Sequence, residues 1–241
     1  MESELDGKQF LVIDRLPEAQ RKQAYEQLRR GQIFIQEMHT VDGNDPIRIP
    51  NGLIHHWAGV IFIPKATLKE VNAVLQDYAN EPRIYKPEIR RAKLIVQNGD
   101  KSKVYLQFFS KSIITIVLDG YFEVTLKSVD NTRSESISRS THIAEVANPG
   151  SADEHERTDG SDHGYMWRLN SYWRIEEKDG GVYAQNESIT LTRTVPVMLA
   201  WIVNPLIKSL PHDVLAHMLD DTQDAVLKKS NVSRSTPQGK K

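Results

Sequence analysis

The sequence predicts an α+β fold, in which a curved antiparallel β-sheet wraps around a long C-terminal helix. Three observations lead to this prediction. Seven segments between 92 and 193 have the composition of strands and are joined by turn residues. An amphipathic helical pattern precedes this run of strands, and a longer, more apolar helical pattern follows it. Successive strands with the helices segregated to the two ends indicate α+β rather than a parallel α/β arrangement.

The first 52 residues are expected to form an N-terminal extension made of a helix and a short strand. A helix is predicted from Pro17 to Arg30, because Pro suits a first helical turn and Gly31 suits the position after the last. A short strand follows at 33–38, and 41–52 is rich in turn residues. The main domain is expected to span 53–228, beginning with a strand at 54–64 and a helix at 66–78, whose apolar residues recur at helical spacing.

The sheet is expected to continue through a series of strands connected mainly by hairpins. Two turns are explicit in the sequence, Asn98-Gly99-Asp100 and Lys178-Asp179-Gly180-Gly181. A long polar loop is expected at 148–164. The predicted strands are 92–96, 104–109, 113–118, 122–128, 134–146, 165–176 and 182–193.

The C-terminal helix is predicted from Val195 to about Leu227. Its first half, up to Leu210, is apolar nearly all round, which indicates a helix buried on most sides, whereas its second half is amphipathic. Pro205 and Pro211 are expected to kink or interrupt it. The Ser-, Lys- and Gly-rich segment 229–241 is expected to be a disordered tail.

Composition narrows the classes of function. The formal net charge is −1, so the excess of Lys and Arg that drives binding to nucleic acids or anionic membranes is absent. The sequence contains no cysteine, which excludes disulfides, thiolate catalysis and Cys-ligated zinc. No segment has the length of apolar sequence that a membrane span needs. These features predict a soluble protein without stable membrane insertion.

The cellular compartment and the oligomeric state are left open by the sequence. The polar, acidic residues 1–9 are not typical of a signal peptide, and an extracytoplasmic location would require that one had been removed. A chain without cysteine is compatible with an oxidising compartment as well as with the cytosol.

Four segments carry a resemblance to a known superfamily. They are HHWAGVIFIPKATLKEV, YKPEI, YMWRLNSYWRIEEKDGGVYAQNESITLTR and VPVMLAWIVNPLIKSLP. They resemble bacterial members of the START-like, or Bet v 1-like (SRPBCC, polyketide cyclase-type), superfamily. The resemblance covers about 53–219 and implies the helix-grip fold, with a hollow between sheet and helix that holds an apolar small molecule. Lipid carriers and polyketide cyclases both belong to this superfamily, so the fold does not fix the function.

Alternation along two strands indicates which side chains face such a hollow. Ser134, Ser136, Ser138 and Ser140 share one face of a strand whose other face carries charged residues, so the serine face is expected to point inward. Four serines fill little volume and would leave space beneath the helix. The alternative is that they pack directly against the helix or lie on a solvated edge. In the strand MWRLNSYWRI, the predicted inner residues are Trp167, Leu169, Ser171, Trp173 and Ile175, as plain core or as walls of a pocket.

Other polar residues admit two interpretations each. In VYAQNESITLTR, alternation places Ser188, Thr190 and Thr192 outward and Gln185 and Glu187 inward. A buried carboxylate is costly without a partner, so Glu187 either binds a ligand hydroxyl or is returned to water by a β-bulge. His55, which shares a face with Trp57, is either a structural hydrogen-bonding residue or an acid–base group. The acidic cluster 153–156 is interpreted as a solvated loop rather than a cation site.

The sequence therefore predicts a protein that binds or carries a hydrophobic small molecule, lipid-like, isoprenoid or aromatic, without metal or cofactor. The alternative is a polyketide cyclase- or hydrolase-like enzyme that uses polar pocket residues as acid and base. No catalytic residue is assigned, because no nucleophile motif, phosphate-binding loop or helical metal-binding pair is present. The candidate cavity residues are His55, Trp57, Tyr78, Tyr85, Tyr105, Ser136, Ser138, Trp167, Leu169, Trp173, Glu187, Met198, Trp201 and Ile202.

Overall fold

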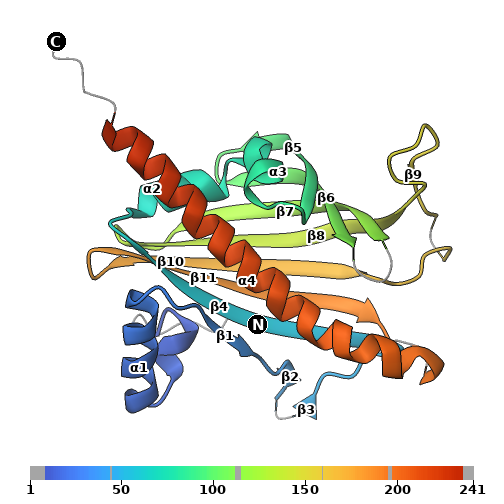
Figure 1. Ribbon diagram of the computed structural model, residues 1–241, viewed down its shortest axis with the longest axis horizontal. Helices are drawn as coiled ribbons and strands as arrows, with labels where there is room; N and C mark the ends of the chain where they lie inside the picture. Colours follow the sequence, from blue (N-terminus) through green and yellow to red (C-terminus); the bar gives the residue numbers. More distant parts are fainter. Residues whose placement is uncertain (1–8, 44, 112–114, 159, 195–196, 236–241) are drawn as a thin grey trace.

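The computed structural model describes residues 9–43, 45–111, 115–158, 160–194 and 197–235; of these, the side chains of 197–210 and 232–235 are not described. Its main body is a large antiparallel sheet, and the long helix α4 (Val197–Ser235) crosses one face of this sheet diagonally (Figure 1). We call the face toward α4 the inner face and the opposite one the outer face. This arrangement confirms the predicted α+β, helix-grip architecture.

The sheet follows the order β1-β4-β11-β10-β8-β7-β6-β5, and each neighbouring pair is antiparallel. The short strand β9 pairs with β8, and β2 with β3 forms a separate ribbon. The strands are β1 (Phe34–Glu37), β2 (Val41–Asp42), β3 (Asp45–Pro46), β4 (Gly52–Pro64), β5 (Ile89–Asn98), β6 (Lys101–Lys111), β7 (Thr115–Ser128), β8 (Arg133–Ala147), β9 (His155–Glu156), β10 (Arg168–Lys178) and β11 (Gly181–Arg193).

The smaller helices lie at the ends and edges of the sheet. Helix α2 begins after Thr67, whose hydroxyl accepts a hydrogen bond from the Glu70 NH while the Glu70 carboxylate accepts from the Thr67 NH, a complete capping box. The predicted helix 66–78 is therefore present but shorter, and a 3-10 turn continues it. The helical elements before α4 are η1 (Val12–Arg15), α1 (Glu18–Arg29), α2 (Leu68–Leu75), η2 (Tyr78–Asn80) and α3 (Glu81–Ile84).

One end of the inner face is closed by the C-terminal half of α4. Leu215 and Leu219 pack there with Ile61, Ile63 and Ile175, all of them at most 2% exposed. Burying five such side chains removes a large apolar area from water, which stabilises this end of the fold. The other end of the inner face contains the candidate site described below.

The outer face is covered in part by the N-terminal segment. Leu11, Ile13 and Leu28 are at most 1% exposed and pack with Val60 and Phe62 of β4. The Val12 NH also donates to Oε1 of Gln185 on β11, over 2.6 Å. Both faces of the central strands are therefore buried at this end of the sheet, one under α4 and the other under residues 10–28.

The C-terminal helix differs from its prediction in two respects. Helix α4 runs to Ser235, so a helix end and disordered tail after Lys228 are wrong for 229–235. The physical reason is burial and bonding: Ser230 is 3% exposed, and Lys229 Nζ donates to the Ala73 carbonyl of α2. The helix also passes Pro205 and Pro211 without a break in its assigned backbone. Residues 236–241 lie outside the described chain.

Candidate functional site: the inner face beneath helix α4

Strand register shows which side chains share the inner face. Trp57 lies opposite Ser188, Ser188 opposite Ser171, and Ser171 opposite Ser138, so these four form one row across β4, β11, β10 and β8. Directly paired residues on antiparallel strands point to the same side. Gly59, two residues along β4 from Trp57, faces Leu215 and Leu219 of α4. The row therefore points toward the helix.

The inner face carries a dense group of hydroxyls, which we call the hydroxyl patch. Each member keeps part of its surface accessible. Small polar side chains in a filled core would be fully buried, so this part of the sheet is covered less completely than the core under Leu215 and Leu219. The patch consists of Ser136, Ser138, Ser140, Ser171, Ser188, Thr190 and Thr192.

Some members of the hydroxyl patch are already hydrogen-bonded within the chain. Oγ of Ser140 accepts from the Leu169 NH over 3.1 Å, and Oγ of Ser171 accepts from the Asn186 amide over 2.7 Å. Among the described residues, by contrast, no partner bonds the hydroxyls of Ser136, Ser138, Ser188 and Thr190. These hydroxyls retain their capacity to donate to and accept from a bound molecule.

His55 and Trp57 form the rim of the patch on β4. His55 Nε2 lies 3.1 Å from Oγ1 of Thr192, and the Trp57 ring meets the His212 ring of α4 edge-on, with 5.6 Å between centroids. Burial lowers the pKa of His55, and the negative charge of Glu37 offsets only part of this effect. His55 is therefore a neutral imidazole at pH 7, which can donate one hydrogen bond and accept another.

An apolar wall adjoins the hydroxyl patch on the side of β6 and β7. Tyr78 of η2, Val104, Phe122 and Val124 form a buried cluster against which Leu169 also packs. Val124 lies opposite Ser138 in the sheet, so the wall and the patch meet directly. Burial raises the pKa of Tyr78, and its hydrogen bond with the Ser102 hydroxyl offsets only part of the rise. Tyr78 therefore stays a neutral phenol at pH 7.

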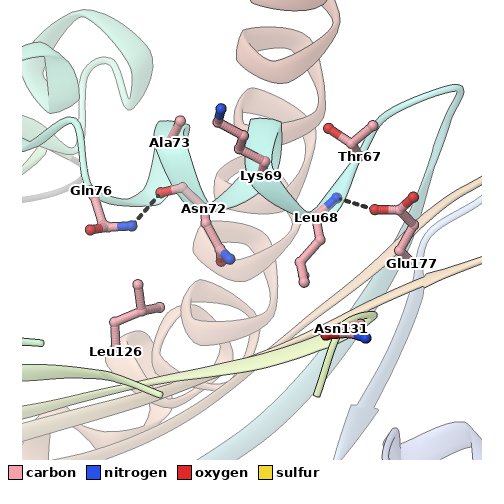
Figure 2. Close-up of a pocket in the computed structure, with 9 residues that line it drawn as sticks. All are labelled: Thr67, Leu68, Lys69, Asn72, Ala73, Gln76, Leu126, Asn131 and Glu177. Carbon is pink, nitrogen blue, oxygen red and sulfur yellow. Dashed lines mark hydrogen bonds between the residues drawn. The ribbon is translucent and has the colours of Figure 1, made fainter. Parts of the chain in front are cut away.

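A pocket of about 490 Å³ opens between α2 and the sheet next to the patch. Figure 2 shows α2 on one side of this pocket, with Leu126, Asn131 and Glu177 on the other. Glu177 fixes the start of α2, because its Oε2 accepts from the Leu68 NH over 2.6 Å. Leu126 pairs with Ser136 across β7 and β8, so the pocket borders the hydroxyl patch.

Several sequence candidates are brought together on the inner face. His55, Trp57, Ser136, Ser138, Leu169 and Trp173 share it with Tyr78, and this confirms the predicted inward direction of the serine face and of the β10 residues. Trp173 is 8% exposed and packs as core. Trp167 lies immediately before β10, where its NH donates to the Leu191 carbonyl and its side chain is partly buried.

Glu187 does not belong to the inner face, and the predicted alternation of β11 is wrong. Ser188, Thr190 and Thr192 point inward, whereas Gln185 and Glu187 point outward. No β-bulge is needed, because β11 keeps an unbroken register with both neighbours. The reason is that the outer face is itself partly buried, so apolar and amide residues of β11 are accommodated there.

On the outer face, Glu187 belongs to a network of charged and polar groups. Its Oε1 lies 2.9 Å from Nε2 of His56, and its Oε2 accepts from Nη1 of Arg174 over 3.0 Å. Nδ1 of His56 in turn lies 2.9 Å from Oγ1 of Thr40. Burial alone would raise the pKa of Glu187, but the hydrogen bond with His56 and the charge of Arg174 outweigh it, so the pKa is lowered. The carboxylate is satisfied by protein groups, away from the inner face.

Two tyrosine candidates also lie away from the patch. Tyr105 is on the outer face of β6, where its hydroxyl donates to Asp119 over 2.7 Å. Tyr85 is buried against the C-terminal half of α4, with its hydroxyl 3.1 Å from Oγ1 of Thr222, and burial raises its pKa. The side chains of Met198, Trp201 and Ile202 lie outside the described part of the structure.

The described side chains of the inner face are hydrogen-bonding and apolar groups. Within the described part of the chain, no three His, Asp or Glu side chains are grouped so that they could hold a metal ion. No helix among the described residues is both long and apolar enough to cross a membrane. On the described inner face near the patch, His55 has no second titratable side chain within hydrogen-bond distance, because its hydrogen-bond partner is a threonine.

Comparisons with known proteins identify the fold. No family model and no curated protein matches the sequence. Among solved structures, human STARD10 has 10% identity and a TM-score of 0.52, covering 91% of this chain and 83% of its own. The Zhui aromatase/cyclase of a Streptomyces species has 10% identity and a TM-score of 0.55, covering 76% of this chain and 100% of its own. A protein of Thermus thermophilus has 12% identity and a TM-score of 0.50, covering 74% and 99%.

These comparisons confirm that the chain has the START-like, helix-grip fold that the sequence resemblance implies. At such low identity they define the fold alone, and the function has to be argued from the site.

Proposed function

We propose that this protein binds a hydrophobic small molecule between the inner face of the sheet and helix α4. The observation that carries the proposal is the hydroxyl patch: side chains such as Ser138 and Ser188 face the helix and keep accessible surface in a place where a closed core would bury them. The apolar wall around Phe122 supplies the complementary surface. The solved structures of similar fold are consistent with this proposal, since an aromatase/cyclase is among them.

The energetics permit such binding. Burying roughly 400 Å² of ligand surface at about 25 cal/mol/Å² corresponds to roughly 10 kcal/mol before the costs of association. Lost rotational and translational freedom removes much of this, so a dissociation constant of roughly micromolar order is expected. This affinity suits a protein that picks up and releases its ligand.

A bulky substitution on the inner face tests the proposal. Ser138→Trp should abolish binding of the neutral fluorescent probe Nile red, because the indole would occupy the space above the patch. Thr125→Trp is the matched control, since Thr125 of β7 lies on the outer face, opposite Ile137. Ser188→Trp repeats the test on another strand in case Ser138→Trp does not fold, and circular dichroism checks folding. Unchanged Nile red affinity in a folded inner-face variant would refute the proposal.

Acid–base catalysis on an enolisable substrate is a second candidate function. The observation in its favour is the neutral imidazole of His55, held by Thr192 at the rim of the site. His55→Gln keeps hydrogen-bonding ability and removes the proton-transfer group. Loss of turnover with retained ligand binding in this variant would establish catalysis, whereas equal properties in both proteins would leave binding as the function.

A further inference from the structure

The proposed binding site on the inner face of the sheet has two chemically different surfaces. On β8, β10 and β11, hydroxyls stand on neighbouring strands, and on β6 and β7 the adjoining surface is aliphatic and aromatic. A molecule that fills this space meets hydrogen-bonding groups along one side and apolar side chains along the other. A fatty acyl chain with a single polar end would match only the second surface.

The spacing of the hydroxyls defines how many polar groups a ligand can present. Ser136 and Ser138 are two residues apart on one strand, which corresponds to about 7 Å. Ser138 and Ser171 lie opposite each other on neighbouring strands, with Cα atoms about 5 Å apart, and Ser188 continues the row. Oxygen atoms distributed over one side of a rigid molecule would match this lattice.

The described part of the inner face near the patch contains no positively charged side chain. The arginines of β8 and β10, such as Arg139 and Arg174, have outward positions in the register, on the opposite side from the patch. The charged residues that do point inward near the patch are acidic: Glu37 lies opposite Trp57, and Glu177 lines the pocket beside α2. The sequence of α4 above the patch, 197–210, contains a single charged residue, Lys208. A carboxylate or phosphate placed at the patch would leave water without a described cationic partner, which is strongly unfavourable.

Resting on the proposed function, we propose that the ligand is an uncharged, rigid apolar molecule that carries several hydroxyl or carbonyl groups along one side. The hydroxyls of Ser136, Ser138, Ser188 and Thr190, which no described residue bonds, bond these groups, and the wall around Phe122 covers the apolar side. Long-chain carboxylic acids and phospholipids are excluded from this part of the site. The hydroxyl patch therefore favours ligands whose polar groups are distributed along one side over ligands with a single polar group at one end.

A steroid series separates the two elements of this proposal. Methyl cholate carries three hydroxyls on one side of an uncharged ring system, cholate adds a carboxylate, and methyl cholanate lacks the hydroxyls. Competition against Nile red should show methyl cholate binding at least about 10-fold more tightly than cholate, because the carboxylate is desolvated without a partner. Methyl cholate should also bind at least about 10-fold more tightly than methyl cholanate, because two or more hydrogen bonds are lost.

Two substitutions tie the discrimination to the patch. Ser138→Ala and Ser188→Ala should each reduce the preference for methyl cholate over methyl cholanate by about 3- to 10-fold. Thr125→Ala on the outer face should leave it unchanged. Absence of Nile red binding to the native protein would refute the proposed function itself. If Nile red binds, equal or tighter competition by cholate or methyl cholanate, or no competition by methyl cholate, would overturn the ligand class alone.

Discussion

The close packing of helix α4 against the sheet can be tested by substitution of Gly59 on β4. A Cβ atom added at this glycine would lie 2.5 Å from Cδ1 of Leu219, 3.3 Å from Cδ2 of Leu215 and 3.4 Å from Cγ1 of Ile35. The contact with Leu219 is closer than packed carbon atoms tolerate, so Gly59→Ala forces this leucine or the helix to move. Overpacking of this kind costs about 1–3 kcal/mol of unfolding free energy.

The same contact predicts compensation by a second substitution. Leu219 is fully buried, so Leu219→Ala should destabilise the protein by about 2–5 kcal/mol. In the double variant, the methyl group added by Gly59→Ala enters the space that Leu219 leaves, and the combined loss should fall short of additivity by at least about 1 kcal/mol.

Urea denaturation followed by circular dichroism measures these free energies. Val214→Ala is the control, because Val214 is 36% exposed and its truncation should change stability by less than about 0.5 kcal/mol. Leu219→Val is the milder alternative if Leu219→Ala does not fold. Full additivity, or a Gly59→Ala variant as stable as the native protein, would contradict the close packing of α4 on β4.

Three further predictions concern ionisation and the end of α4. Burial, with a contribution from Asp77, raises the pKa of Glu81 to about 8, so the folded protein keeps a proton that the unfolded chain releases near pH 4.3. The free energy of unfolding should therefore fall by about 1.4 kcal/mol per pH unit between these two values. Glu81→Gln should abolish this slope when denaturation is measured at pH 5–8. The lowered pKa of Glu187 acts in the opposite sense: the stabilisation by its carboxylate is present above about pH 4.3 and is lost as the pH falls through the pKa of the folded state. Glu187→Gln should therefore make the free energy of unfolding less dependent on pH on the acid side. An unchanged pH dependence would contradict the network with Arg174. Truncation after Lys228 removes the buried Ser230, and the melting temperature should fall by about 2–4 °C for each kcal/mol of unfolding free energy that is lost. An unchanged melting temperature would show that residues 229–235 contribute nothing to stability.

The sequence predicted most of the elements because their patterns are local. The strand at 134–146 was assigned its inner face correctly, since charged residues such as Glu135 and Arg139 require water and leave the serines to face the helix. The predicted strands 113–118 and 122–128 are one strand, β7, because Gly120 continues the ladder opposite Leu106.

The alternation of β11 was predicted wrongly because both faces of this strand are partly buried. On β11, alternation could not distinguish a face covered by α4 from a face covered by the N-terminal segment, since both accept apolar side chains. Gln185 therefore pointed the wrong way in the prediction: its partner, the Val12 NH, is 173 residues away in the chain. The signal that would have helped is pairing, because Trp57 and Ser188 are cross-strand neighbours. Such long-range register is not encoded in the local pattern of either strand.

The central claim is that an apolar molecule occupies the space between the hydroxyl patch and α4. Backbone amide NMR of the native protein titrated with Nile red tests this most directly, because shifts and intermolecular NOEs locate the bound probe. We predict that changes concentrate on 136–140, 169–173 and 188–192, with α1 unaffected. Changes confined to the exposed apolar residues Leu94, Ile95 and Val96 of the edge strand β5, or an absence of changes on the inner face, would contradict the account.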